Sequence, residues 1–319
     1  MTEEYSRFHD FFEGEGFLPV DEKSYPIIKT YGRYSILQEM SAVIMVIWNY
    51  NYYGLYKIIE GYFCSVYFYE GREIYWNIHR PEEAAGNACS LGHIIDILFD
   101  LCEKAGLPFF QVKLIEERFL DDFKNIESYE IDVRCFNEND EYAYKIEDLI
   151  NLSGTVNYYK RKRVKKFFEM TNVSIRPMTN ENMKLCFEIE EEWCKHQDCG
   201  FCISFTGCEK KAMEAMALIF DDRIHTGLFL YQDETPAGYI ICEKISEKLA
   251  FLYLGKANVP DGFVYLIYIM FRDHIKAGYM NIHEDMGHPG LRRFKTLLAP
   301  HELWRKYIVT YLKKGGQIR

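Results

Sequence analysis

Residues 263–285, FVYLIYIMFRDHIKAGYMNIHED, decide the fold because the chain carries the same pattern a second time. Residues 91–117 read LGHIIDILFDLCEKAGLPFFQVKLIEE. Each stretch is an apolar helix ending in Lys-Ala-Gly, with Gly106 or Gly278 expected in the left-handed conformation that closes a helix. A short strand ending in an acidic pair and then a second helix follow each one. Two copies of one α/β unit predict two domains of the same fold.

The other patterns of the second half predict a mixed α/β sheet with helices on both faces. The expected elements there are a strand over 173–178, helices over 182–196 and 208–222, and three strands over 227–258 with turns at Asp233-Glu234 and Ser246-Glu247. In the first half, a helix over 35–50 precedes strands over 54–78 that turn at Glu70-Gly71.

Composition limits the class of protein. The 319 residues suit two domains, and 48% hydrophobic with 16% aromatic residues can fill two cores. A net charge of −10 argues against a general nucleic-acid coat protein. The acidic N-terminus does not resemble a secretory signal, and no apolar run is long enough for a transmembrane segment. We therefore expect a cytoplasmic protein whose ten cysteines are reduced.

Six basic residues crowd into residues 160–166, inside the stretch NLSGTVNYYKRKRVKKFFEM (151–170). Val164, Phe167 and Phe168 have helical spacing, which predicts a basic helix between the domains. The predicted division is an N-terminal domain over 1–150, a linking helix over 151–170 and a C-terminal domain over 171–319.

Two segments resemble a known family. They are residues 151–168 and residues 251–307, the second containing the pattern N-x-x-E-D-x-G-x-x-G-L-R-x-x-K. The chain resembles soluble members of the family built on the C-terminal domain of bacterial phosphatidylglycerol lysyltransferases. The resemblance implies tandem acetyltransferase-like (GNAT) domains. It also implies transfer of an acyl group, or an aminoacyl group from a charged tRNA, to a small-molecule amine or hydroxyl acceptor.

Residues 281–300 allow two interpretations. His283 and His288, beside Glu284 and Asp285, suggest metal ligands, but two histidines five residues apart do not have the i, i+4 spacing of helical zinc motifs. We therefore predict no metal here. The favoured interpretation is a helix opened by Pro289, whose N–H groups and nearby basic residues face an anion. The alternative is that the acidic pair only caps this helix and pairs with its arginines.

The predicted site follows from the favoured interpretation, in which the helix start faces an anion. Glu284 or Asp285 would orient the acceptor or accept its proton. Lys256 and Arg292 would neutralise a donor phosphate or the developing oxyanion. The full predicted substrate-binding set is Lys256, Asn258, Asn281, Gly290, Arg292, Arg293 and Lys295. The first domain lacks the glycine-arginine segment after Glu116-Glu117, so we expect it to be structural.

The basic run has two functional interpretations, tRNA phosphates or an anionic lipid surface, and a third in which it is only a solvated helix face. Its members are Lys160, Arg161, Lys162, Arg163, Lys165 and Lys166. Tyr158 and Tyr159 beside it are candidates for stacking on bases.

Two further features bear on cofactors. The turn KANVPDGF (256–263) has only Gly262, a poor cradle for the pyrophosphate of coenzyme A. We therefore expect no bound cofactor, and take aminoacyl-tRNA or acyl-coenzyme A as the donor substrate. Cys194, Cys199, Cys202 and Cys208, near His196, contain only one C-x2-C pair, so reduced thiols are favoured over zinc.

Two other functions stay open from sequence alone. One is a non-catalytic GNAT scaffold that binds RNA or an anionic metabolite. The other is an ordinary acetyl-coenzyme A-dependent N-acetyltransferase.

Overall fold

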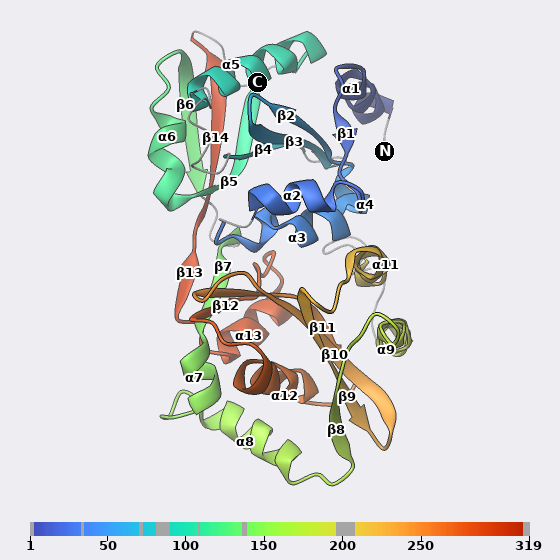
Figure 1. The fold of residues 1–319 in the computed structure, drawn as a ribbon. Coiled ribbons are helices and arrows are strands. Elements are labelled where there is room, and N and C mark those ends of the chain that lie inside the picture. Colours follow the sequence, from blue (N-terminus) through green and yellow to red (C-terminus); the bar gives the residue numbers. More distant parts are fainter. Residues whose placement is uncertain are drawn as a thin grey trace. The chain divides into compact units, whose positions relative to one another are not determined.

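A computed structural model describes residues 3–32, 35–69, 73–80, 90–107, 109–135, 139–195 and 208–314 (Figure 1). The chain forms two compact units, and neither is one continuous stretch of sequence. Unit 1 contains residues 1–137 and 305–319, and unit 2 contains residues 138–304.

Unit 1 is built on a seven-stranded sheet in the order β1-β2-β3-β4-β5-β14-β6. The strands are β1 (Leu18–Pro19), β2 (Leu55–Ile59), β3 (Tyr62–Tyr69), β4 (Glu73–His79), β5 (Phe110–Glu116), β6 (Tyr129–Cys135) and β14 (Lys306–Lys313). The helices are α1 (Glu3–Gly14), α2 (Tyr25–Gly32), α3 (Ala42–Ile47), α4 (Asn49–Tyr52), α5 (Leu91–Ala105) and α6 (Leu120–Lys124). Short 3-10 turns cover Gln38–Met40 and Glu117–Phe119.

Unit 2 is built on a second seven-stranded sheet, in the order β13-β7-β12-β11-β10-β9-β8. The strands are β7 (Glu141–Lys145), β8 (Val173–Pro177), β9 (His225–Gln232), β10 (Thr235–Lys244), β11 (Leu249–Ala257), β12 (Tyr279–Asn281) and β13 (Glu302–Trp304). The helices are α7 (Ile146–Asn151), α8 (Tyr158–Phe168), α9 (Leu185–Lys195), α11 (Glu209–Ile219), α12 (Gly262–Ile269) and α13 (Pro289–Leu297), and a π-helical turn covers Met270–His274.

The two sheets have the same strand directions. In each, four strands pair antiparallel, the fourth pairs parallel with the fifth, and two antiparallel strands complete the sheet. The helix that crosses over between the parallel strands is α5 in unit 1 and α12 in unit 2. The predicted fold class, a mixed α/β sheet repeated in two GNAT-like domains, is confirmed.

Each sheet takes one strand from beyond its own stretch of chain. In unit 2, β7 lies between β12 and β13 although it follows β6 in the sequence. In unit 1, β14 lies between β5 and β6 although it follows β13. This exchange makes the compact units differ from the division predicted from sequence, which assigned β7 to the first domain and β14 to the second. The predicted linking helix, α8, lies within unit 2.

Local sequence explains several of the helix ends. The Ser41 and Ser90 side chains accept hydrogen bonds from the N–H groups of Ile44 and His93, as N-caps do. Gly106 closes α5 with a φ of 84° as predicted. The same prediction for Gly278 is wrong, because its φ is not positive. Gly278 instead passes the Lys248 carbonyl, which a Cβ atom would meet at 3.1 Å.

The predicted helix over 35–50 is also interrupted. It consists of the 3-10 turn, α3 and α4, which are separated at Ser41 and Trp48. The predicted turn at Glu70-Gly71 lies outside the described residues. None of the helices in the described ranges is both long and apolar enough to cross a membrane.

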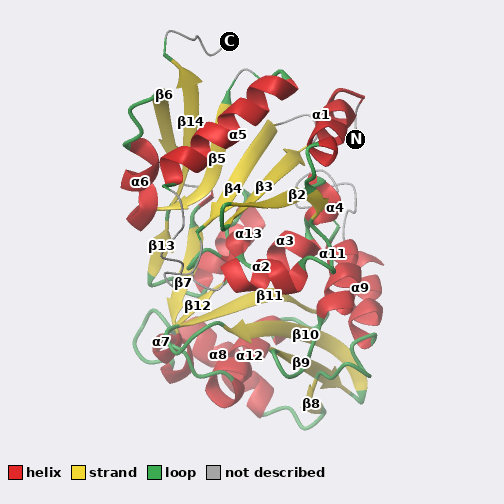
Figure 2. Cartoon of the chain, turned by 45° about the horizontal axis from the view of Figure 1, so that its top comes forward, coloured by secondary structure: helices red, strands yellow, loops and turns green. Residues whose placement is uncertain are grey.

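Different helices pack on the two faces of the unit 2 sheet (Figure 2). Apolar residues of β9, β10 and β11, such as Ile240 and Leu252, pack with α12 and α8 in one core. On the opposite face, Tyr239 of β10 meets Glu190 of α9. Polar side chains concentrate on this second face, which is where the candidate site begins.

The strand exchange makes a stability prediction. Tyr311 of β14 is fully buried among unit 1 residues, and its hydroxyl donates to the Phe123 carbonyl at 2.7 Å. We expect Tyr311→Ala to lower the free energy of unfolding by about 3–5 kcal/mol. In hydrogen exchange, protection should fall at β5 and β6. Leu303→Ala on the exposed end of β13 is the control. Protection lost in β12 and β13 instead would contradict the exchange.

Candidate functional site

The sheet of unit 2 opens at the end of β11. β11 pairs with β10 from Ala250 to Ala257, but it pairs with β12 only from Leu249 to Phe251. Beyond that point β11 and β12 are no longer paired. A pocket of about 520 Å³ lies where β11 runs into α12.

Three aromatic rings line this pocket, which we call the Asn258 pocket. Phe263 of α12 and Phe294 of α13 are stacked, with ring centroids 5.6 Å apart. Trp193 of α9 also lines it, and the Lys256 ammonium lies 5.3 Å from that ring. Sequence reasoning missed all three residues, because aromatic residues in so aromatic a chain are usually core.

A buried charge cluster lies beside the pocket, on the polar face of the sheet. Lys256 is only 7% exposed, and its Nζ donates to Glu190 Oε2 at 2.8 Å and to the Glu209 carboxylate. The Tyr239 hydroxyl donates to the other oxygen of Glu190. Glu190 is fully buried, whereas the Glu209 side chain is 40% exposed. Glu209 is therefore the member of the cluster that solvent reaches.

The pKa values follow from these contacts. Burial works to lower the pKa of Lys256, but the carboxylates of Glu209 and Glu190 outweigh it and raise that pKa above its usual value. Burial, reinforced by Glu190, raises the pKa of Tyr239 well above its usual range. Lys256 is thus a cation and Tyr239 a neutral donor near neutral pH.

This cluster changes the role predicted for Lys256. With both glutamates ionised, two negative charges face one positive charge, and the cluster carries a net charge of −1. An ammonium already neutralised twice is poorly suited to neutralise a donor phosphate. The second carboxylate suits a cationic ligand such as an ammonium instead.

Asn258 is the second predicted site residue at the pocket. Its side-chain Nδ2 donates to the Ile189 carbonyl at 3.1 Å, and its backbone N–H donates to the Ala237 carbonyl at 2.7 Å. These bonds fix the strand end that carries Lys256 against α9.

The start of α12 carries an acid. Asp261 is the N-cap, with a φ of 66°, and Arg163 of α8 pairs with it at 3.0 Å. Both residues line the pocket. A Cβ on Gly262 would come within 2.6 Å of Val259 and 2.8 Å of Leu230. Gly262 is therefore required by packing, and a carboxylate lies at the helix start where a pyrophosphate would need positive partners.

A separate cluster holds the loop before α13. Asp285 is 2% exposed and accepts hydrogen bonds from Arg292 at 2.8 and 3.0 Å, from Tyr142 at 2.5 Å and from the Gly287 N–H at 2.8 Å. Burial works to raise the pKa of Asp285, but the bonds from Arg292 and Tyr142 outweigh it and lower that pKa. Such a carboxylate is a weak proton acceptor, which does not suit its predicted role.

Lys295 and Asn281 complete this loop cluster. Lys295 Nζ donates to three consecutive backbone carbonyls, of Ile282, His283 and Glu284, and so fixes the loop. The Asn281 side chain donates to Glu141 and accepts from the His283 N–H at 2.8 Å. These residues hold the backbone of the loop in place.

The remaining members of the predicted set lie at the start of α13. This helix begins at Pro289 as predicted, and the His288 side chain caps it by accepting from the Leu291 N–H. Gly290 packs against His288, which a Cβ would meet at 2.8 Å. Arg293 is exposed on the outer face of α13, and Glu284 is half-buried.

The basic run divides into three groups. Lys160 is 3% exposed and donates to the Leu298 carbonyl at 2.6 Å, and burial lowers its pKa to about 8. It therefore cannot contact a phosphate without leaving its site, contrary to the prediction. Arg161 donates to the carbonyls of Leu152 and Gly154, and Arg163 faces the pocket. Lys162, Lys165 and Lys166 are exposed, as is Arg161.

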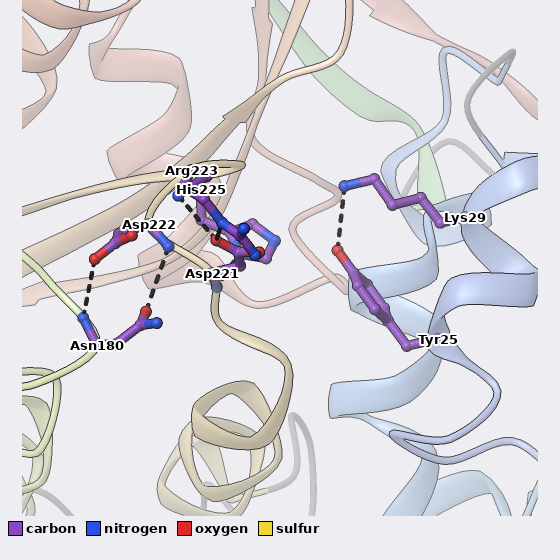
Figure 3. A network of polar contacts seen from close by, with 7 residues as sticks. All are labelled: Tyr25, Lys29, Asn180, Asp221, Asp222, Arg223 and His225. Atoms are coloured by element: carbon purple, nitrogen blue, oxygen red, sulfur yellow. Dashed lines mark hydrogen bonds and ion pairs between the residues drawn. The ribbon is translucent and has the colours of Figure 1, made fainter.

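Two other groups lie away from the pocket. Between α11 and β9, Arg223 pairs with Asp221 at 2.7 Å, and the Asp221 N–H donates to His225 Nδ1 at 3.1 Å (Figure 3). These contacts fix a turn. Of the cysteines weighed as zinc ligands, Cys194 and Cys208 are half-buried, while Cys199, Cys202 and His196 lie outside the described residues.

The two repeated sheets, with a pocket where the parallel strands separate, define a tandem GNAT-like protein. The model of the family "Phosphatidylglycerol lysyltransferase, C-terminal" matches residues 67–310. The chain belongs to this family. No curated protein matches the chain in sequence.

Solved structures share this fold. A conserved protein of unknown function from Bacteroides thetaiotaomicron has a TM-score of 0.80 at 19% identity, covering 93% of this chain and 99% of that one. The C-terminal domain of a candidate lysylphosphatidylglycerol synthetase from Agrobacterium fabrum has a TM-score of 0.62 at 10% identity, over 91% and 92%. FemX has a TM-score of 0.54 at 9% identity, over 90% and 94%.

The loop cluster predicts a pH-dependent stability. When folding lowers the pKa of a carboxyl group, that group stabilises the folded state at every pH above its pKa in the unfolded chain. The stabilisation is lost as the pH falls through the pKa of the group in the folded state. We expect Asp285→Asn to cost about 1–3 kcal/mol at pH 7, because Arg292 and Tyr142 lose a charged acceptor. The difference from the parent chain should shrink in acid. Chemical denaturation at pH 7 and pH 3 measures it.

Asp121→Asn, at an exposed ion pair, is the control for this experiment. If Asp285→Asn were no more destabilising than this control, the loop cluster would not hold the fold.

Proposed function

We propose that the chain transfers an aminoacyl group from a charged tRNA to an amine or hydroxyl acceptor, at the Asn258 pocket of unit 2. The observation that carries this is the pocket with its aromatic walls at the open end of β11, next to which lies the anionic charge cluster of Lys256, Glu190 and Glu209. Membership of the lysyltransferase family and the fold shared with FemX support the reaction class.

The chemistry of the walls suits the end of a charged tRNA. The rings of Trp193, Phe263 and Phe294 offer surfaces for the terminal adenine, since bases stack on aromatic side chains. The amino group of an aminoacyl ester is a cation near neutral pH, and Glu209 belongs to a cluster with one surplus negative charge. An acyl-coenzyme A donor offers no such cation, and its pyrophosphate would meet Asp261.

The transfer step needs no cofactor. The acceptor nitrogen or oxygen attacks the ester carbonyl, a new amide or ester bond forms, and the bond to the ribose oxygen breaks. The acceptor loses one proton and the departing ribose hydroxyl gains one. Holding the two substrates together supplies much of the acceleration. We assign acceptance of the acceptor's proton to Glu209, in place of Asp285, which is committed to Arg292.

In this assignment Lys256 is a positioning residue. It binds both glutamates and so sets where the Glu209 carboxylate lies. Asn258 fixes the strand end, and the loop cluster around Asp285 holds the backbone that leads into α13. Lys162, Lys165 and Lys166 are exposed, which lets them contact an anionic partner, either tRNA or a lipid surface.

The assignment is tested by comparing two matched substitutions. We expect Glu209→Gln to lower transfer by about 10²–10⁴-fold, the usual contribution of a general base. Glu284→Gln, the same change in the pair predicted from sequence, should leave transfer within about threefold. The assay follows loss of labelled amino acid from total aminoacyl-tRNA, with small-molecule and lipid extracts supplied as acceptors.

Other outcomes point elsewhere. Loss of transfer in Glu284→Gln but not in Glu209→Gln would return the role to the loop before α13. Binding of tRNA without any transfer would favour the non-catalytic scaffold.

The choice of donor makes a separate prediction. Because Asp261 occupies the helix start, acetyl-coenzyme A should not raise the thermal unfolding midpoint of the chain at millimolar concentration. Charged or uncharged tRNA should raise it, and the effect should weaken with salt. Stabilisation by acetyl-coenzyme A alone would support an ordinary acetyltransferase.

A further inference from the structure

The N-terminal end of α8 presents exposed apolar side chains beside cations. Val156 is 68% exposed, Tyr159 64% and Tyr158 53%. These are large exposed fractions for apolar and aromatic side chains, and exposed apolar side chains that lie together mark interaction surfaces. Together with three exposed lysines they form the α8 surface: Val156, Tyr158, Tyr159, Lys162, Lys165 and Lys166.

Helix geometry places these residues on one side. Lys160, Val164 and Phe167 are the buried residues of α8, and they pack toward the core of unit 2. Tyr158, Lys162 and Lys165 have the spacing i, i+4, i+7, which puts them together on the opposite face. The outward face of α8 therefore carries two aromatic rings in its first turn and lysines in the following turns.

The charge of this face is strongly positive. Lys162, Lys165 and Lys166 are exposed, and Arg161 adds a fourth cation at the same end. Glu169 is the acid nearby on the helix, and it lies 3.6 Å from Lys165. In a chain of net charge −10, such a concentration of cations favours an anionic partner.

The geometry of the rings separates two possible partners. Stacking on bases needs an open aromatic face. Tyr158 and Tyr159 meet edge to face, with centroids 5.4 Å apart and planes at 79°, and Arg161 lies 6.0 Å from the Tyr158 centre, so these contacts occupy part of the ring surface that a stacked base would use. Val156 offers no stacking surface at all. The rings and Val156 form an apolar projection flanked by cations, as in segments that enter the interface of a bilayer.

A groove adjoins the projection. It has a volume of about 710 Å³ and is lined by the rings of Tyr158 and Tyr159 and by the loop from Asn151 to Thr155. Ser153 and Thr155 give it hydroxyl groups, and Arg161 gives it a positive charge. The exposed lining of the groove is mostly apolar, and Arg161 already donates to the Leu152 and Gly154 carbonyls, so the groove extends the apolar projection.

We propose that the α8 surface docks the protein onto an anionic lipid bilayer, with Val156, Tyr158 and Tyr159 in the interface and the lysines against the headgroups. This is peripheral attachment and does not depend on the proposed reaction. The test therefore measures vesicle binding and not turnover, so either idea can fail alone.

The experiment is flotation of the full chain with vesicles of phosphatidylcholine, alone or with 30% phosphatidylglycerol or phosphatidylserine. We expect binding only to the anionic vesicles, and less at higher salt. Lys162→Glu/Lys165→Glu/Lys166→Glu should lower the affinity at least about 100-fold. Tyr158→Ser/Tyr159→Ser should lower it about tenfold and leave the thermal unfolding midpoint unchanged.

A matched control carries the same change of net charge elsewhere in unit 2. Lys184, Lys210 and Lys248 are exposed on other elements, and their triple change to Glu should keep vesicle binding. Equal loss in both triple variants, or no binding to anionic vesicles, would overturn the proposal. So would salt-sensitive binding to total tRNA that only the α8 variants lose, because the surface would then serve RNA.

Discussion

The candidate site depends on one constraint, the short parallel pairing of β11 with β12. Pairing stops at Phe251, but β11 continues to Ala257 along β10. The end of β11 is therefore held on one side only, and the start of α12 lies beside the opening. Lys256 and Asn258 lie on this strand end or just past it, and both are bonded to α9 or its neighbours.

Charge then distinguishes the two clusters of unit 2. Around Asp285, the protein itself supplies Arg292, Tyr142 and the Gly287 N–H as donors, so the cluster is closed around its acid, which is 2% exposed, although the Arg292 side chain is 52% exposed. Around Lys256, two carboxylates share one ammonium, and one of them is 40% exposed. A closed cluster serves stability, because its groups are already satisfied. An open cluster with surplus charge is suited to bind a ligand, and for this reason we place the chemistry there.

The fold could be read from sequence because it depends on local patterns. The repeated helix, strand and helix around Gly106 and around residues 263–285 predicted two equal sheets. The exchange of β7 and β14 depends on pairing between strands far apart in the sequence, and no local sequence pattern reports such pairing. The predicted division therefore placed these two strands in the wrong units. The site was only partly predictable. Asn258 lines the pocket and Lys256 lies next to it, but Glu190, Glu209 and Trp193 come from helices far away in sequence, and no spacing relates them to β11. Asp285 and Lys295 were recognised as unusual, yet sequence cannot tell an internal ion pair from a site.

The most direct measurement of the central claim is binding of a stable donor mimic, 3′-aminoacylamino-3′-deoxyadenosine, to the purified chain and to Trp193→Ala. Titration calorimetry at neutral pH measures both affinities. If the Asn258 pocket holds the aminoacyl-adenosine end of the donor, the parent chain binds the mimic and Trp193→Ala binds it at least about tenfold more weakly, as expected for loss of one stacking surface. Equal binding by both proteins, or no binding by the parent chain, would contradict that placement.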